Sequence, residues 1–119
     1  MAKTSPDPLG DLLPLTPAVF YILFALAEGE KHGYAVMKEV ENISGGQFRM
    51  GPATLYTTIQ RLLELGLIEE TSTSSDSERR RRSYRLSRRG RQIFEAELNR
   101  MESLVRSAQR RKLVPREAR

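Results

Sequence analysis

Residues 51–68, GPATLYTTIQRLLELGLI, carry helix signals at both ends and along one face. Pro52 suits a first helical position, because its missing N–H would have no partner there. Gly66 suits the residue just after a helix, where the backbone enters the left-handed region. The apolar positions between them fall at i, i+4, i+7 and i+8 on one stripe: Leu55, Ile59, Leu62 and Leu63. The stretch therefore predicts an amphipathic helix with one buried face.

The outer face of this helix carries groups that suit nucleic-acid recognition. Hydroxyls, an amide and a guanidinium gather there, and acid is almost absent: Thr54, Tyr56, Thr57, Gln60 and Arg61. Such groups hydrogen bond to base edges and phosphates. Taken alone, these residues favour the polar surface of an ordinary amphipathic helix. The neighbouring sequence therefore has to decide between the two interpretations.

A long apolar run predicts the first helix, at residues 16–28. Thr16 can cap it and Pro17 can occupy its first turn. The run is too short to span a bilayer, which takes about 20 apolar residues. It is apolar nearly all round, so we expect one side to meet the core and another to meet a second subunit.

A second helix is predicted from Tyr34 to Ile43, after a turn at residues 28–33. The triplet Ser44-Gly45-Gly46 is expected to end it. A helix, a short connection and a second helix with a polar outer face form the helix-turn-helix arrangement.

A basic hairpin is predicted directly after the central helix. Residues 67–71 favour a strand, and residues 83–87 favour another in which Tyr84 and Leu86 share a buried face. Arginines concentrate in and after this hairpin: Arg79, Arg80, Arg81, Arg82, Arg85, Arg88, Arg89 and Arg91. Phosphates supply the counter-charge that such a cluster lacks. A solvated loop or a localisation-type basic run is the alternative, but beside the central helix we favour a nucleic-acid-binding wing.

Residues 90–113 predict a long final helix with an apolar seam. Its seam residues are spaced 4, 3, 4 and 3 apart: Phe94, Leu98, Met101, Val105 and Ala108. This spacing is typical of a helix that pairs with another helix. Packing within the monomer satisfies part of it, but the first helix also lacks a second surface. We therefore expect a homodimer whose interface also includes Phe20, Leu23 and Phe24.

The composition limits the other functions that are open to this chain. Its 119 residues fit one domain with a modest core, and a net charge of +5 favours an anionic partner. The lack of cysteine and the single His32 exclude disulfides and cysteine- or histidine-rich metal sites. We find no nucleophile–base pair and no phosphate-cradling glycine loop. We therefore expect that the protein is not an enzyme and that it binds no cofactor or metal. The lack of cysteine and of a convincing signal-peptide cleavage site favours the cytoplasm.

Four short motifs occur in order along the chain. They are His32-Gly33-Tyr34, Thr54-Leu55-Tyr56, Arg61-Leu62 with Leu65-Gly66-Leu67-Ile68, and Arg82-Ser83-Tyr84-Arg85-Leu86-Ser87 with Gly90. Together, over about residues 12–110, they resemble the PadR family of bacterial transcriptional regulators. The resemblance implies a winged helix-turn-helix repressor that acts as a homodimer through its C-terminal helix. Many members respond to small aromatic or hydrophobic molecules, so such an effector is a candidate ligand, here expected between the subunits.

The resemblance also assigns roles to individual residues. It implies base reading by Thr54, Tyr56, Thr57, Gln60 and Arg61. It implies DNA-backbone contacts by Lys31, Tyr34 and Lys38, and backbone or minor-groove contacts by Arg79, Arg80, Arg81, Arg82 and Arg85. The wing departs from the family pattern, because Asp76-Ser77-Glu78-Arg79 stands where a Gly-Arg turn is common. The resemblance therefore does not fix the geometry of this turn.

The expected fold is mainly α (α+β). It comprises a flexible arm (1–11), a winged helix-turn-helix domain (12–90), a C-terminal dimerisation helix (91–113) and a frayed tail (114–119). We expect the protein to act as a dimeric, sequence-specific repressor that binds a palindromic site in double-stranded DNA. We expect no membrane partner. A winged-helix module that binds an acidic protein is the alternative. RNA binding is disfavoured, because the chain lacks an aromatic strand face that stacks exposed bases.

Overall fold

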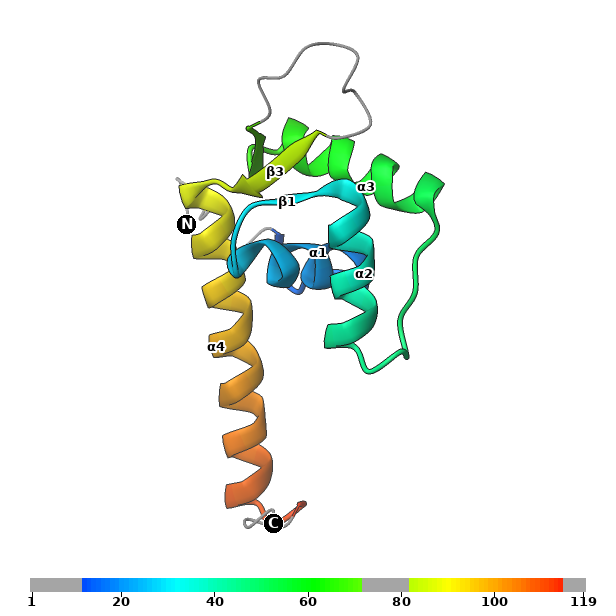
Figure 1. Cartoon of the computed structure of the whole chain (residues 1–119). Helices are drawn as coiled ribbons and strands as arrows, with labels where there is room; N and C mark the ends of the chain where they lie inside the picture. Colours follow the sequence, from blue (N-terminus) through cyan, green and yellow to red (C-terminus); the bar gives the residue numbers. More distant parts are fainter. Residues whose placement is uncertain (1–11, 72–81, 115–119) are drawn as a thin grey trace.

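The computed structural model describes residues 12–71 and 82–114 (Figure 1). Its elements follow in the order α1 (Pro17–Ala27), β1 (Lys31–His32), α2 (Gly33–Ile43), α3 (Pro52–Glu64), β2 (Ile68–Glu70), β3 (Ser83–Leu86) and α4 (Arg88–Arg110). The expected mainly α (α+β) winged-helix fold is confirmed. The predicted arm (1–11), most of the predicted tail (115–119) and the wing residues Arg79, Arg80 and Arg81 lie outside the described residues.

The helix ends follow the sequence signals closely. The Thr16 hydroxyl accepts a hydrogen bond from the Val19 N–H at 3.3 Å and caps α1. At the end of α3, Gly66 has φ +75°, and the Leu67 N–H donates to the Leu62 carbonyl at 2.9 Å. This Schellman arrangement satisfies carbonyls that the helix leaves without partners. The glycine pair after α2 ends that helix with the same pattern.

The core lies where α1, α2, α3, the sheet and the first half of α4 meet. Its largest fully buried apolar residues come from the four helices and from the connection between α3 and β2: Ile22, Leu23, Leu26, Val36, Val40, Leu55, Ile59, Leu62, Leu67 and Ile93. The predicted stripe on α3 is buried at Leu55, Ile59 and Leu62, whereas Leu63 is half-buried against the core. Burial of this stripe fixes which face of α3 remains outside.

The sheet has three antiparallel strands in the order β1-β3-β2. The predicted hairpin is confirmed, and Ile68 lies opposite Leu86. The turn predicted for residues 28–33 is wrong at Lys31 and His32, which form β1 along the other edge of β3. Two residues give no detectable periodicity, so the pairing partner and not the local sequence defines this strand. His32 Nδ1 and the hydroxyl of Ser83, 2.9 Å apart, share a hydrogen bond that joins β1 to β3.

Helix α4 begins two residues before its predicted start at residue 90, and it ends three residues before its predicted end at residue 113. It begins at Arg88 because the Ser87 hydroxyl accepts the Gly90 N–H at 3.0 Å and caps the helix. It ends at Arg110 because Lys112 adopts a left-handed conformation, with φ +60°. The first half of α4 lies against the body of the molecule, and the second half extends beyond it (Figure 1).

A buried carboxylate joins α4 to the segment before α1. Glu97 is 1% exposed and accepts the Leu15 N–H at 3.0 Å. Arg100 donates to it from Nε at 2.7 Å and from Nη2 at 3.1 Å. The Arg100 hydrogen bonds, together with the Leu15 N–H, hold the pKa of Glu97 below its usual value, although burial acts in the opposite direction. Glu97 is therefore charged and fully partnered at neutral pH.

Candidate nucleic-acid interface

The outer face of α3 presents four of the five predicted base-reading residues. Thr54, Thr57, Gln60 and Arg61 are exposed, on the side opposite the buried stripe. Figure 1 shows α3 along one side of the molecule, next to the sheet. Thr58 differs from its neighbours, because its hydroxyl donates to the Thr54 carbonyl at 2.8 Å and thus back to its own helix. The face therefore offers hydroxyl, amide and guanidinium groups over two turns of a rigid helix.

Tyr56, the fifth predicted base reader, has a different environment. Its side chain is 44% exposed, and its ring packs against Gly33 at the start of α2. A Cβ atom at position 33 would collide with the Tyr56 hydroxyl, so the ring in this position requires a glycine at position 33. This contact links two of the sequence motifs, and it joins the starts of α2 and α3. Sequence reasoning missed it, because neither residue follows an apolar period.

The start of α2 places two predicted backbone-contacting residues on one exposed side. Tyr34 and Lys38 are one helical turn apart, and the Lys38 Nζ atom lies 5.7 Å from the centre of the Tyr34 ring. This is within the range of a cation–π contact. Lys31 is half-buried on β1. A phenol and an ammonium group on α2 are therefore available beside the beginning of α3, and the Lys31 ammonium group lies on β1.

The arginines at the base of the wing are paired with acids. Arg85 Nε lies 3.0 Å from Glu69 Oε1, and Arg82 Nε lies 3.3 Å from Glu70 Oε2. The expectation that the basic cluster lacks counter-charge is therefore wrong for these two residues. The reason is the register, which sets the acidic strand β2 beside the basic strand β3. Tyr84 lies between them, and its burial, reinforced by the charge of Glu70, raises the pKa of its phenol.

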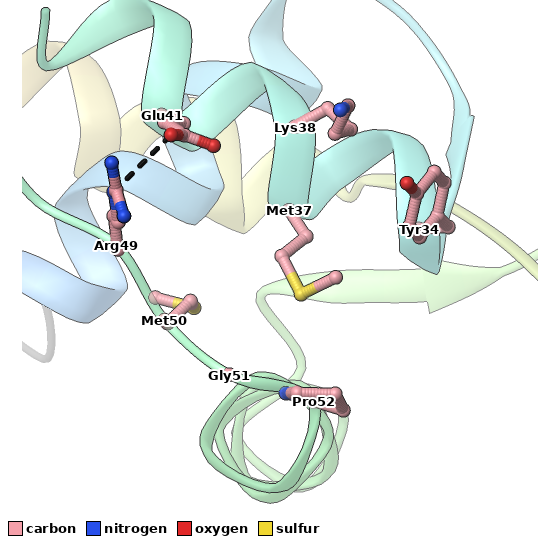
Figure 2. Close-up of a pocket in the computed structure, with 8 residues that line it drawn as sticks. All are labelled: Tyr34, Met37, Lys38, Glu41, Arg49, Met50, Gly51 and Pro52. Carbon is pink, nitrogen blue, oxygen red and sulfur yellow. Dashed lines mark ion pairs between the residues drawn. The ribbon is translucent and has the colours of Figure 1, made fainter. Parts of the chain in front are cut away.

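A cavity of about 320 Å³ lies between α2 and the beginning of α3 (Figure 2). Met37 extends from α2 toward Pro52, and Met50 lines the cavity from the connection between the helices. Arg49 and Glu41 form an ion pair at 3.2 Å on one side of it. The remaining lining residues are Tyr34, Lys38 and Gly51. The cavity lies within one protomer, whereas the effector site expected from the resemblance lies between subunits and stays a prediction.

The predicted dimer-interface residues fall into three groups. Leu23 is fully buried in the core of its own protomer, so its assignment to an interface between subunits is wrong. It was chosen because α1 is apolar all round, a pattern that does not distinguish the inner side from the outer one. Phe20, Phe24 and Phe94 form a ring cluster, in which Phe94 lies 5.7 Å from Phe20 and 5.4 Å from Phe24. Phe20 and Phe24 remain partly exposed, whereas Phe94 is buried.

The third group is the far part of the predicted seam on α4. Leu98 and Val105 are exposed, and Met101 and Ala108 are partly exposed. Leu104 adds a further exposed apolar side chain. Within the part of the chain that the structure describes, no helix combines the length and apolar character needed to cross a membrane.

Three comparisons place this geometry among known proteins. An uncharacterised 37.1 kDa protein in transposon TN4556 of Streptomyces fradiae is 34% identical over 87 residues, which cover 73% of this chain and 24% of that protein. This chain therefore spans about a quarter of the length of that relative. A complex structure of hsRosR-S4, from H. salinarum, superimposes with a TM-score of 0.68 and 26% identity, over 82% of this chain and 79% of that one.

The fold is also shared with a regulator that was solved on DNA. The crystal structure of Bacillus subtilis PadR in complex with operator DNA matches with a TM-score of 0.61 and 22% identity, over 71% of this chain and 47% of that chain. The family described as the transcriptional regulator PadR-like family matches residues 22–96, which is more than half of the chain. The motifs and the winged-helix geometry agree with that match. The chain belongs to the transcriptional regulator PadR-like family.

Proposed function

We propose that this protein is a dimeric repressor that binds a palindromic operator in double-stranded DNA. The observation that carries the proposal is the exposed face of α3, which lies opposite the buried side chains of this helix. The exposed residues are Thr54, Thr57, Gln60 and Arg61. The major groove, about 12 Å wide, admits one α-helix and presents a distinct donor and acceptor pattern for each base pair. A helix held rigidly by its buried side can present these four groups to base edges.

The neighbouring basic groups supply the contacts to the DNA backbone. Lys31, Tyr34 and Lys38 would meet phosphates on one side of α3, and Arg82 and Arg85 would meet them on the other. The wing arginines beyond the described residues, Arg79, Arg80 and Arg81, would extend the second set. Tyr56, packed on Gly33, would hold α2 and α3 in register and contribute only the edge of its ring to DNA.

Two copies of the chain would read the two halves of the operator. The exposed seam on α4 supports pairing, because an isolated helix gains nothing from leaving Leu98 and Val105 in water. In helix-turn-helix dimers the two recognition helices enter successive major grooves about 34 Å apart. A twofold axis near α4 would make the operator palindromic. Occupation of such a site next to a promoter would block transcription.

The first experiment is a titration of genomic DNA fragments by gel shift or fluorescence anisotropy at several salt concentrations. The logarithm of the affinity should fall with the logarithm of the salt concentration, with a slope of about −0.9 per phosphate neutralised. A salt-independent affinity would argue against the role of the wing. No retardation at low salt would favour a module that binds an acidic protein instead.

The second experiment separates base reading from backbone contact. Arg61→Ala should lose about 1–3 kcal/mol of binding free energy on the operator and much less on random DNA, if Arg61 reads a base. Equal losses on both would place Arg61 on the backbone. Arg106→Ala is the matched control, because Arg106 is an equally charged, exposed residue on α4, away from α3 and the wing.

A further inference from the structure

The hairpin that carries the arginines also carries two adjacent acids, Glu69 and Glu70 on β2. A carboxylate near a DNA phosphate raises the electrostatic free energy of the complex. These residues therefore oppose the function proposed above, unless they have a role of their own. The structure shows what they contact in the protein without DNA.

Each acid is matched to one arginine by the pairing of the strands. Glu69 lies directly opposite Arg85, and Glu70 lies opposite Tyr84, from where it reaches Arg82. The Arg85 and Glu69 side chains are 59% and 49% exposed, so packing does not prevent either of them from changing partner. Both arginines are among the residues that would meet phosphates. A carboxylate of the protein and a phosphate of DNA would therefore compete for the same guanidinium group.

The exposed Glu69–Arg85 pair differs from the Glu97–Arg100 pair in the number of its hydrogen bonds and in its burial. Arg85 donates to Glu69 from Nε alone, at 3.0 Å. Arg100 donates to Glu97 from both Nε and Nη2, and the Glu97 carboxylate is buried. Two-point contacts to a buried anion are stronger and more directional than a one-point contact in water. Glu97 holds its arginine as part of the fold, whereas Glu69 holds its arginine loosely.

We propose that Glu69 and Glu70 are positioning residues that retain Arg85 and Arg82 in the free protein and lower its affinity for DNA. Formation of a phosphate contact requires each arginine to leave its carboxylate, so part of the binding free energy is spent on breaking these pairs. The effect applies to the DNA backbone and is therefore the same for operator and random DNA. This inference rests on the proposed function.

The test measures DNA affinity for Glu69→Gln and Glu70→Gln by fluorescence anisotropy on an operator and on a random duplex. Each variant should bind both DNAs roughly two- to five-fold more tightly than the unmodified protein, as expected for the loss of an exposed ion pair. The matched control is Glu102→Gln. Glu102 pairs with Arg106 at 3.0 Å, with the two side chains 61% and 63% exposed, but on α4. This control should leave the affinity unchanged.

A double-mutant cycle decides whether Glu69 acts through Arg85. Glu69→Gln in an Arg85→Ala background should gain much less affinity than it does alone, because no guanidinium remains to be released. An equal gain in both backgrounds would mean that Glu69 only repels phosphate, and would overturn the proposal. Thermal melting of all variants checks that they fold, and exposed residues such as these should leave the melting temperature nearly unchanged.

Failure of the two proposals can be distinguished with the same data. If the unmodified protein does not bind either DNA at low salt, the proposed function fails and the inference falls with it. If the unmodified protein binds and neither Gln variant binds more tightly, only the role of Glu69 and Glu70 is overturned.

Discussion

At the scale of single residues, Gly90 is the described glycine at which an added Cβ atom would come closest to a neighbouring atom. It lies in the first turn of α4, where a Cβ atom would collide with the backbone carbonyl of Leu67. That carbonyl also accepts the Ser87 N–H at 3.0 Å, so it cannot simply move away. Gly90→Ala should therefore lower the free energy of unfolding by about 1–3 kcal/mol, through overpacking. Urea denaturation measures this change.

Gly33→Ala provides the comparison for Gly90→Ala. The obstacle at Gly33 is the tip of the Tyr56 side chain, which can rotate, and not a backbone carbonyl. We expect a smaller loss of stability, and a Gly33→Ala/Tyr56→Ala double variant should lose less than the sum of the two single changes. Equal losses for the two glycines would contradict the distinction between a backbone obstacle and a side-chain obstacle.

Glu97 makes stability depend on pH. Its pKa is lower in the folded protein than in the unfolded chain, so its contribution is fully present above the unfolded value. That contribution is lost as the pH falls through the lower, folded pKa. Glu97→Gln should lower the free energy of unfolding by about 1.5–3 kcal/mol at pH 7, the size of a hydrogen bond to a charged group. The difference between variant and unmodified protein should shrink below about pH 4.5. Urea titrations at several pH values test this, and a constant difference would rule out the charge as the cause.

The sequence predicts some of these residue roles and cannot predict others. It identifies the exposed face of α3, because burial of the opposite stripe follows from its period. It gives no sign of Glu97, since an acid next to a seam is usually solvated and only the fold brings Leu15 to it. The ion pairs of Glu69 and Glu70 could have been predicted from the sequence, because alignment of the two predicted strands as a hairpin places acids beside arginines.

At the scale of elements, the end of α3 depends on the backbone of one residue. Gly66 has φ +75°, and an added Cβ atom there would meet open space. Glycine is therefore favoured at position 66 by its backbone conformation and not by a lack of space for a side chain. Gly66→Ala should lower the free energy of unfolding by about 1 kcal/mol, and Gly66→Asn by less, because Asn tolerates the left-handed region better. Thermal or urea denaturation of both variants checks the order, and a larger loss for Asn would contradict this reason.

Element boundaries are predicted well where a residue type is required and poorly where context decides. Glycine marks the ends of α2 and α3 in the sequence as it does in the structure. The end of α4 is not marked, because Lys112 takes the left-handed position that glycine takes elsewhere. Strand β1 is likewise invisible in the sequence, since its two residues are ordered by β3 alone.

At the scale of the whole molecule, α4 divides into two parts with different surroundings. Phe94, near its start, belongs to the protomer core, while Leu104 and Val105 lie on the half that extends beyond the body (Figure 1). The sequence pattern places Phe94 and Val105 in one continuous seam. Only the position of the body along the helix shows where intramolecular packing stops and where the proposed pairing with a second subunit would begin.

Val105→Asp should dissociate the proposed dimer without lowering the stability of the protomer. Val105 is 53% exposed in the isolated chain, so the substitution leaves the core untouched. In a paired seam it would bury two unpartnered carboxylates near the twofold axis, which costs about 3 kcal/mol or more. Analytical ultracentrifugation should then find monomers at concentrations where the unmodified protein is a dimer, and operator affinity should fall with the loss of the second half-site.

Two controls make the Val105→Asp result specific to the seam. Ser103→Asp adds the same charge to an exposed position off the seam, so the dimer should persist. Phe94→Ala should instead lower the stability of the protomer itself, by about 3–5 kcal/mol, because Phe94 is buried against the rings of α1. If Val105→Asp remains dimeric while folded, the two subunits pair through another surface. The operator geometry inferred from α4 would then have to be replaced by one centred on that surface, since half-site spacing follows from the twofold axis.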